Sequence, residues 1–204
     1  MALNDYSNLK TSIANFLARD DLTSVIPDFI SLAESRMSRE LDTRSQEKRA
    51  IGTTVAGEEF ISLPTDLREV RMVKLNNSPN SVLEFMPPTT LYKTYNSTSA
   101  GTPLAYTIIG VEIALRPIPD SVLNVEIIYG ESIASLSDTN TTNTVLTRHS
   151  DCYVYGTLAQ AYNYLMDETR ALQYDAMFTR IIAEIIKDTE VARFGGGALS
   201  MKLS

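Results

Sequence analysis

One stretch of the chain, from Cys152 to Met166, is long enough to form a helix and contains no charged residue. Helical spacing places an apolar stripe on one of its faces, made of Tyr155, Leu158, Ala159, Tyr162, Leu165 and Met166. The opposite face carries Tyr153, Thr157, Gln160 and Tyr164, without the Lys and Glu residues of a solvated face. A helix without a charged side needs protein on both sides. We therefore expect one neighbour from the same chain and the other from a second copy.

The composition is that of a folded protein large enough to bury a core: of 204 residues, 44% are hydrophobic and 21% are charged. No run of about 18 apolar residues occurs, so we expect no membrane-spanning segment. The N-terminal residues lack the pattern of a secretory signal peptide. The single cysteine, Cys152, excludes an internal disulfide and fits a reducing compartment.

The net charge of −7 argues against a protein that binds nucleic acid through its phosphates, which requires a cluster of Lys and Arg. The one basic concentration is interleaved with acidic residues and consists of Arg36, Arg39, Arg44, Lys48 and Arg49. Because Glu40 stands four residues from both Arg36 and Arg44, we interpret this region as a salt-bridged helix face.

The order of patterns along the chain predicts an α+β fold, in which N- and C-terminal helices form a bundle and an antiparallel β region is inserted between them. We expect residues 1–47 and 149–194 to form the bundle and residues 48–148 the insertion. Residues 195–204 would be a flexible tail. Within the insertion, Ala50–Val55 and Glu59–Leu63 are expected to form one hairpin, and Leu104–Ile109 and Val111–Leu115 another around Gly110.

Motifs of enzymes are absent from the sequence: it contains no G-x-S-x-G, H-E-x-x-H, C-x-x-C or Walker loop. The only histidine, His149, lies three residues before Cys152, a spacing that would allow a thiol–imidazole pair on one helical turn. No group that would orient this pair is recognisable. We therefore predict no catalytic residue, no metal site and no cofactor, and keep a small Cys-dependent hydrolase as the alternative from another class.

Three glycines, Gly195, Gly196 and Gly197, follow the last predicted helix, where glycine commonly ends a helix rather than binding phosphate. Beyond them, Leu199, Met201 and Leu203 alternate with polar or small residues. This period of two allows the segment to add to a partner as an extended strand.

Several segments resemble, in the expected order, the head-to-tail adaptor proteins of tailed bacteriophages. The resemblance rests on Ile30–Met37, Leu63–Arg71, the hairpin Tyr106–Pro119, and Leu146–Gly156 with the later Asp167–Ala171. Family members often carry Pro where this chain has Ser150. These motifs are packing and turn patterns, and none of them is as specific as a catalytic signature. The resemblance therefore rests on their common order along nearly the whole chain.

The resemblance implies a structural virion protein that forms a homo-oligomeric ring, with twelve copies as the expected number, beneath the portal. Such a ring connects the capsid to tail or nozzle proteins and leaves a channel through which DNA passes without sequence-specific binding. The helices would form the ring body, with Tyr153, Thr157, Gln160 and Tyr164 at the subunit interface. The β region would face the tail, and the C-terminal residues Gly195, Gly196, Gly197, Leu199, Met201 and Leu203 would dock against the portal. The protein would be located at the head–tail junction of the virion, and in the host cytoplasm during assembly, without a membrane.

Two other assignments stay open at this point. Another ring of the neck, a stopper or a tail terminator, would differ in the partner that it binds. A stand-alone dimer would differ in its mass.

Overall fold

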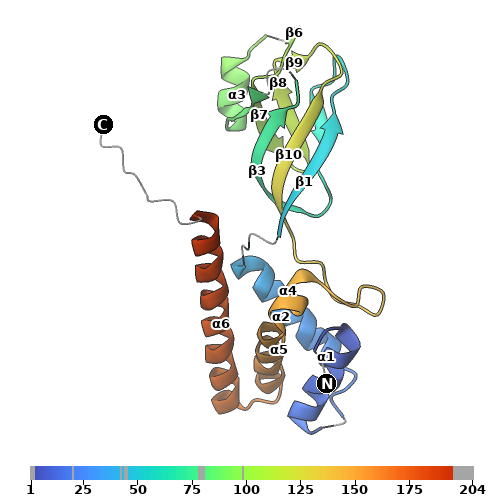
Figure 1. Ribbon diagram of the computed structural model, residues 1–204, viewed down its shortest axis with the longest axis vertical. Helices are drawn as coiled ribbons and strands as arrows, with labels where there is room; N and C mark the ends of the chain where they lie inside the picture. Colours follow the sequence, from blue (N-terminus) through green and yellow to red (C-terminus); the bar gives the residue numbers. More distant parts are fainter. Residues whose placement is uncertain are drawn as a thin grey trace, which may run out of the picture. The chain divides into compact units, whose positions relative to one another are not determined.

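The computed structural model describes residues 3–194 except positions 20, 42, 44, 45, 78–80 and 98, and for 192–194 it describes the backbone alone. In this part the chain forms two compact units (Figure 1): a helical unit from residues within 1–46 and 133–204, and a β unit from residues within 47–132. The architecture is α+β, as the sequence predicted. The chain leaves the β unit after Ser132, whereas the expected boundary was at residue 148.

The helical unit contains α1 (Tyr6–Leu17), α2 (Ile26–Glu40), α4 (Thr144–Arg148), α5 (Ser150–Tyr164) and α6 (Glu168–Phe194). Local signals explain where these helices begin. The Asp5 carboxylate accepts a hydrogen bond from the Asn8 backbone N–H at 2.8 Å and caps α1, and Asn143 caps α4 through the Leu146 N–H at 2.8 Å. Pro27 occupies the first turn of α2, where its missing N–H costs nothing.

The central helix of this unit is α5, which packs against α1, α2, α4 and α6. Figure 1 shows it running beside α6. It approaches α6 and α2 closely at Gly156, where an added Cβ would lie 2.8 and 2.9 Å from two ring carbons of Phe178 on α6 and 3.3 Å from the Ala33 Cβ on α2. The three helices therefore meet where α5 has no side chain.

The β unit has two four-stranded sheets that share one apolar core. The first has the order β1 (Glu47–Thr53), β10 (Asn124–Glu131), β3 (Leu67–Leu75), β4 (Ser81–Val82), and the second has the order β2 (Phe60–Ser62), β8 (Glu112–Arg116), β7 (Ala105–Ile109), β5 (Glu84–Phe85). A short pair, β6 (Ala100–Gly101) and β9 (Ile118–Pro119), and the helix α3 (Pro88–Thr94) complete it. Val73, Leu115 and Val125 are among the core residues supplied by the two sheets.

Of the two predicted hairpins, the one around Gly110 is confirmed, since β7 pairs antiparallel with β8 and Gly110 has a φ of 63°. The hairpin predicted between β1 and β2 is wrong. The chain does turn at Gly57, but β1 pairs with β10 and β2 pairs with β8, in different sheets. Pairing with the distant β10 places β1 beside the buried Val125 and Ile127, a packing contact that local turn residues do not encode.

The approach at Gly156 generates a first prediction. Gly156→Ala is expected to lower the free energy of unfolding by about 1–2 kcal/mol, because overpacking against the Phe178 ring outweighs the higher helix propensity of alanine. Thermal and urea unfolding followed by circular dichroism would measure the change. Gln160→Ala, on a half-exposed position of the same helix, is the control and should change the stability by less than about 0.5 kcal/mol. An unchanged stability of Gly156→Ala would contradict the packing described.

Candidate interaction surfaces

The four residues predicted to face a second copy lie in two different environments. Tyr153 and Thr157 have no exposed surface, because other residues of the same chain cover them. Gln160 is half-buried, and Tyr164 is 60% exposed. A subunit contact through this helix therefore has Gln160 and Tyr164 available to it, and not Tyr153 or Thr157.

The hydroxyl of Tyr153 belongs to a buried polar network around Glu34, which itself is 5% exposed. The Glu34 carboxylate accepts hydrogen bonds from the Tyr153 hydroxyl at 3.0 Å and from the Leu136 backbone N–H at 2.8 Å. The Asn143 side-chain amide in turn donates to the Tyr153 oxygen at 2.7 Å and to the Ala134 carbonyl at 2.8 Å. The network thereby attaches the segment that returns from the β unit to α2 and α5. Burial raises the pKa of Glu34, and burial likewise raises the pKa of Tyr153.

The turn between α5 and α6 and the start of α6 present apolar side chains to solvent. Met166 is 89% exposed and Leu172 is 70% exposed, and Tyr164 contacts Phe29 with ring centroids 5.4 Å apart. Met166 has a φ of 57°, in the left-handed region that favours glycine. Its N–H donates to the Asn163 carbonyl and the next N–H donates to the Tyr162 carbonyl, the two bonds of a Schellman motif. Met166 therefore combines an exposed apolar side chain with a backbone conformation that is unfavourable for a residue other than glycine.

The thiol–imidazole alternative finds no support in the geometry. Cys152 is fully buried, with its Sγ 3.4 Å from the Met37 Sδ, and burial raises its pKa to about 12. Burial also lowers the pKa of His149. A thiol kept neutral at physiological pH is a poor nucleophile, so this site does not favour a Cys-dependent hydrolase.

The predicted ion pair between Arg36 and Glu40 is confirmed, with 2.9 Å between Nε and Oε1. The Arg36 guanidinium also binds the Asp175 carboxylate and lies over the Phe178 ring, 4.7 Å from its centroid. Lys48 and Arg49 are not on this helix but on β1, and Arg44 lies outside the described residues.

Among the residues that the structure describes, no three His, Cys, Asp or Glu side chains are grouped so that they could hold a metal ion. No helix within the described ranges has the length and hydropathy needed to cross a membrane.

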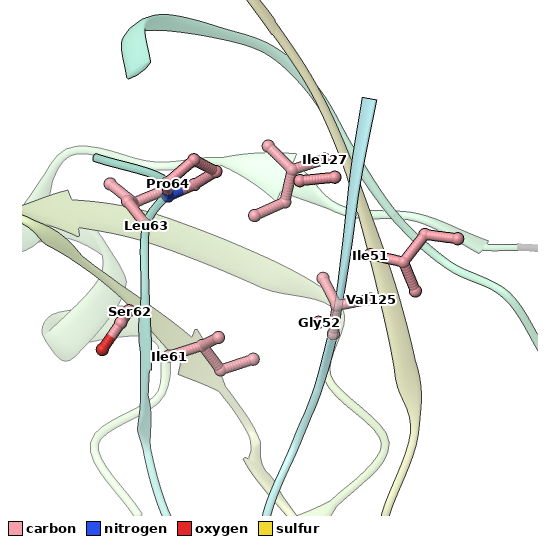
Figure 2. A pocket seen from close by; sticks show the side chains of 9 residues that line it. Ile51, Gly52, Ile61, Ser62, Leu63, Pro64, Val125 and Ile127 are labelled. Atoms are coloured by element: carbon pink, nitrogen blue, oxygen red, sulfur yellow. The ribbon is translucent and has the colours of Figure 1, made fainter. Parts of the chain in front are cut away.

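The β unit has an uncharged hollow of about 220 Å³ between its two sheets (Figure 2). Figure 2 shows Ile61, Leu63, Pro64 and Ile127 around one space, whereas Ile51 points away on the other side of β1. The lining consists of Ala50, Ile51, Gly52, Ile61, Ser62, Leu63, Pro64, Val125 and Ile127.

The C-terminal residues that were expected to dock against the portal all lie outside the described residues. They are Gly195, Gly196, Gly197, Leu199, Met201 and Leu203.

Sequence reasoning missed three of these features, and one of them left a readable signal. Glu34 lies four residues after Ile30 and three before Met37, so it occupies an apolar position of the α2 pattern. A carboxylate at such a position indicates a buried polar partner. The conformation of Met166 and the hollow have no comparable signal, because one depends on a backbone angle and the other on long-range strand pairing.

Exposed apolar surfaces on both units are typical of a protein that acts through contacts with other proteins. The comparison with known families identifies the class of protein to which the chain belongs. A family model described as SU10 adaptor protein matches residues 4–200, and the chain therefore belongs to this family of phage adaptor proteins. No curated protein matches the chain. The family resemblance inferred from the sequence motifs is thus confirmed.

The buried carboxylate gives a pH-dependent prediction. Because the pKa of Glu34 is raised in the folded state, the unfolded chain ionises this group first, near pH 4.3. The difference in the free energy of unfolding, wild type minus Glu34→Gln, should be greatest below that pH and fall as the pH rises through the folded pKa. Urea unfolding of both proteins at a series of pH values measures this difference, in which the other titrating groups cancel. A difference that stays constant or grows with pH would show that Glu34 is not buried in this way.

Proposed function

We propose that copies of this chain assemble into a ring beneath the portal, join the capsid to the tail and leave a channel through which DNA passes. The family match over residues 4–200 supports a head-to-tail connection, since it extends over both units. In this proposal the helical unit forms the ring body, with twelve copies as the number to be checked, and the β unit faces the tail or nozzle proteins. The protein is then a virion component of the head–tail junction.

The observation that best supports a ring is the exposed apolar surface of the helical unit where α5 ends and α6 begins. Tyr164, Met166 and Leu172 expose most of their surface. A non-glycine residue held in the left-handed region costs of the order of 1–3 kcal/mol, a strain that usually persists where function requires it. Contact with a neighbouring copy would bury the Met166 side chain and offset that cost.

The charge of the protein is compatible with a passage for DNA. A net charge of −7 leaves no overall attraction for the phosphates of a passing duplex. At physiological salt, exposed charges act over only about 8 Å, so the channel would depend on the acidic residues that face it.

Imaging by negative stain of the purified chain mixed with its portal tests the proposal directly. We expect a ring of adaptor density on the tail-facing side of the portal. Portals that stay bare while the chain binds a tail tube instead would favour the alternative, a stopper or tail terminator. A monodisperse dimer under all conditions would contradict any ring.

A charge at the exposed end of α5 should separate assembly from folding. Tyr164→Asp is expected to reduce ring formation at least tenfold, since it places a carboxylate in an apolar contact, yet to cost only about 0.3–1 kcal/mol in stability. Asn163→Asp is the matched control, because it places the same charge on a neighbouring exposed position at the same helix end. Particle counts from imaging and urea unfolding give the two readouts. Equal effects of the two variants on assembly would rule out a contact through Tyr164.

Relief of backbone strain should have opposite effects on the single chain and on the ring. Met166→Gly is expected to raise the free energy of unfolding by up to about 1 kcal/mol and to weaken ring formation, because it removes both the strain and the exposed side chain. Ala18→Gly, at another described non-glycine residue with a positive φ, removes only a methyl group and controls for glycine itself. If Met166→Gly assembled like the wild type, Met166 would have no part in the interface.

A further inference from the structure

The helical unit has a polar pocket of about 290 Å³ between α2 and the segment that returns from the β unit. Its lining consists of Ser31, Glu34, Ser35, Ser38, Ile133 and Ser135. The four residues from α2 stand at i, i+3, i+4 and i+7, so they share one face of that helix. Ser31 and Ser35 are exposed, whereas Glu34 is 5% exposed. The pocket therefore opens to solvent at the serines and has Glu34 at its base.

Glu34 is a buried acid without a counter-ion. In the part of the chain that the structure describes, no Lys or Arg forms an ion pair with it. Lys10 on α1 is paired with Asp138 at 2.8 Å. Arg36 on α2 is paired with Glu40 at 2.9 Å. The groups that bind the Glu34 carboxylate are neutral donors, and burial raises its pKa in spite of them, as expected for an acid that lacks a neighbouring cation.

The bonds that Glu34 already makes favour an ammonium over a guanidinium as the missing cation. Its Oε1 accepts both the Tyr153 hydroxyl at 3.0 Å and the Leu136 N–H at 2.8 Å. A guanidinium pairs best with both carboxylate oxygens at once, and the two bonds to Oε1 make that geometry less favourable. An ammonium needs one oxygen of the carboxylate and can direct its other N–H groups to hydroxyl oxygens. Ser31 and Ser38 supply such oxygens in the same pocket.

The apolar part of the lining favours a cation that carries a methylene stem. Ile133 is half-buried and packs against the helical core. The four-carbon stem of lysine commonly lies along apolar surface while its ammonium binds polar groups. An inorganic cation would leave the contact with Ile133 unused, and the described residues offer no group of three ligating side chains to hold one. The pocket thus matches both ends of a lysine side chain.

We propose that this pocket binds a lysine side chain of another protein, with the ammonium at Glu34 and the methylene stem along Ile133. Charge complementarity identifies the occupant, since the buried acid lacks a cation and the chain as a whole has a net charge of −7. A free amine would lose more freedom on binding than a lysine that a wider protein contact already holds in place. All lining residues belong to one helical unit, so the site does not depend on the proposed ring.

NMR spectroscopy of the full chain tests the site with a probe of this chemistry, Nα-acetyl-lysine methylamide. At millimolar probe we expect saturable shifts of the backbone amides of residues 31–38 and 133–136. Nα-acetyl-norleucine methylamide keeps the stem without the ammonium, and it should bind at least tenfold more weakly. Equal binding of the two probes, or shifts confined to other parts of the chain, would overturn the proposal.

Variants of the chain test the residues that hold the ammonium. Glu34→Gln removes the charge but keeps an oxygen for the bonds that Oε1 accepts, and it should weaken binding of the lysine probe at least tenfold. Glu168→Gln, at an exposed acid of α6, is the matched control and should change binding less than twofold. Ser38→Ala should weaken binding about threefold or more, with the exposed Ser24→Ala as its control. Equal losses in both Glu variants would reduce the effect to net charge and exclude the site, and if Glu34→Gln does not fold, the serine pair and the uncharged probe still decide.

Two further measurements separate the possible occupants. Nα-acetyl-arginine methylamide should bind more weakly than the lysine probe, and tighter binding would contradict the assignment to lysine. Sedimentation of the chain alone should give the same species for the wild type and for Glu34→Gln. A loss of oligomers in that variant, but not in Glu168→Gln, would show that a lysine of a second copy fills the pocket and would overturn the assignment to another protein.

Discussion

The helical unit depends on the close approach of α2, α5 and α6 at Gly156. The absence of a side chain there lets the Phe178 ring lie against the backbone of α5, with Ala33 on its other side. The Arg36 guanidinium covers the same ring and binds Asp175, so that a polar group closes the outer side of the contact. Because α5 is enclosed in this way, the part of α5 that is left for other molecules lies mainly at its C-terminal end, where Tyr164 is exposed.

A second constraint acts where the chain returns from the β unit. Glu34 supplies a buried acceptor for the Leu136 N–H, and Lys10 and Tyr6 hold the same segment through Asp138 and the Thr141 carbonyl. A buried N–H without an acceptor would cost about 1–3 kcal/mol, which explains a carboxylate at an otherwise apolar position. These bonds attach residues 133–143 to the helices, and they account for a unit boundary at Ser132 rather than at residue 148.

The sequence predicted what depends on local pattern and misjudged what depends on distant partners. The order of patterns predicted helices at both ends of the chain, and Gly110 predicted its hairpin, because each depends on residues close together in the sequence. The hairpin of β1 with β2 was wrong, since β10 offers β1 a longer apolar partner from the far end of the insertion. The uncharged helix α5 likewise shows that a local pattern does not identify a distant packing partner. The absence of charge correctly predicted protein on all sides of Tyr153, but it contained no information on whether that protein was a second copy or the same chain.

The two units leave apolar surface uncovered in different ways, and the difference determines what each can recognise. At the end of α5, side chains such as Met166 project from a fixed helix end, so a partner must match their shape, and single substitutions should matter. In the β unit, the hollow beside β1 is lined by uncharged, mostly aliphatic residues, so a partner there would need apolar groups that fill it. In the proposed ring, each copy would hold its neighbours in one geometry and also connect to a chemically different partner. Separate surfaces on the two units would allow these two requirements to be met independently.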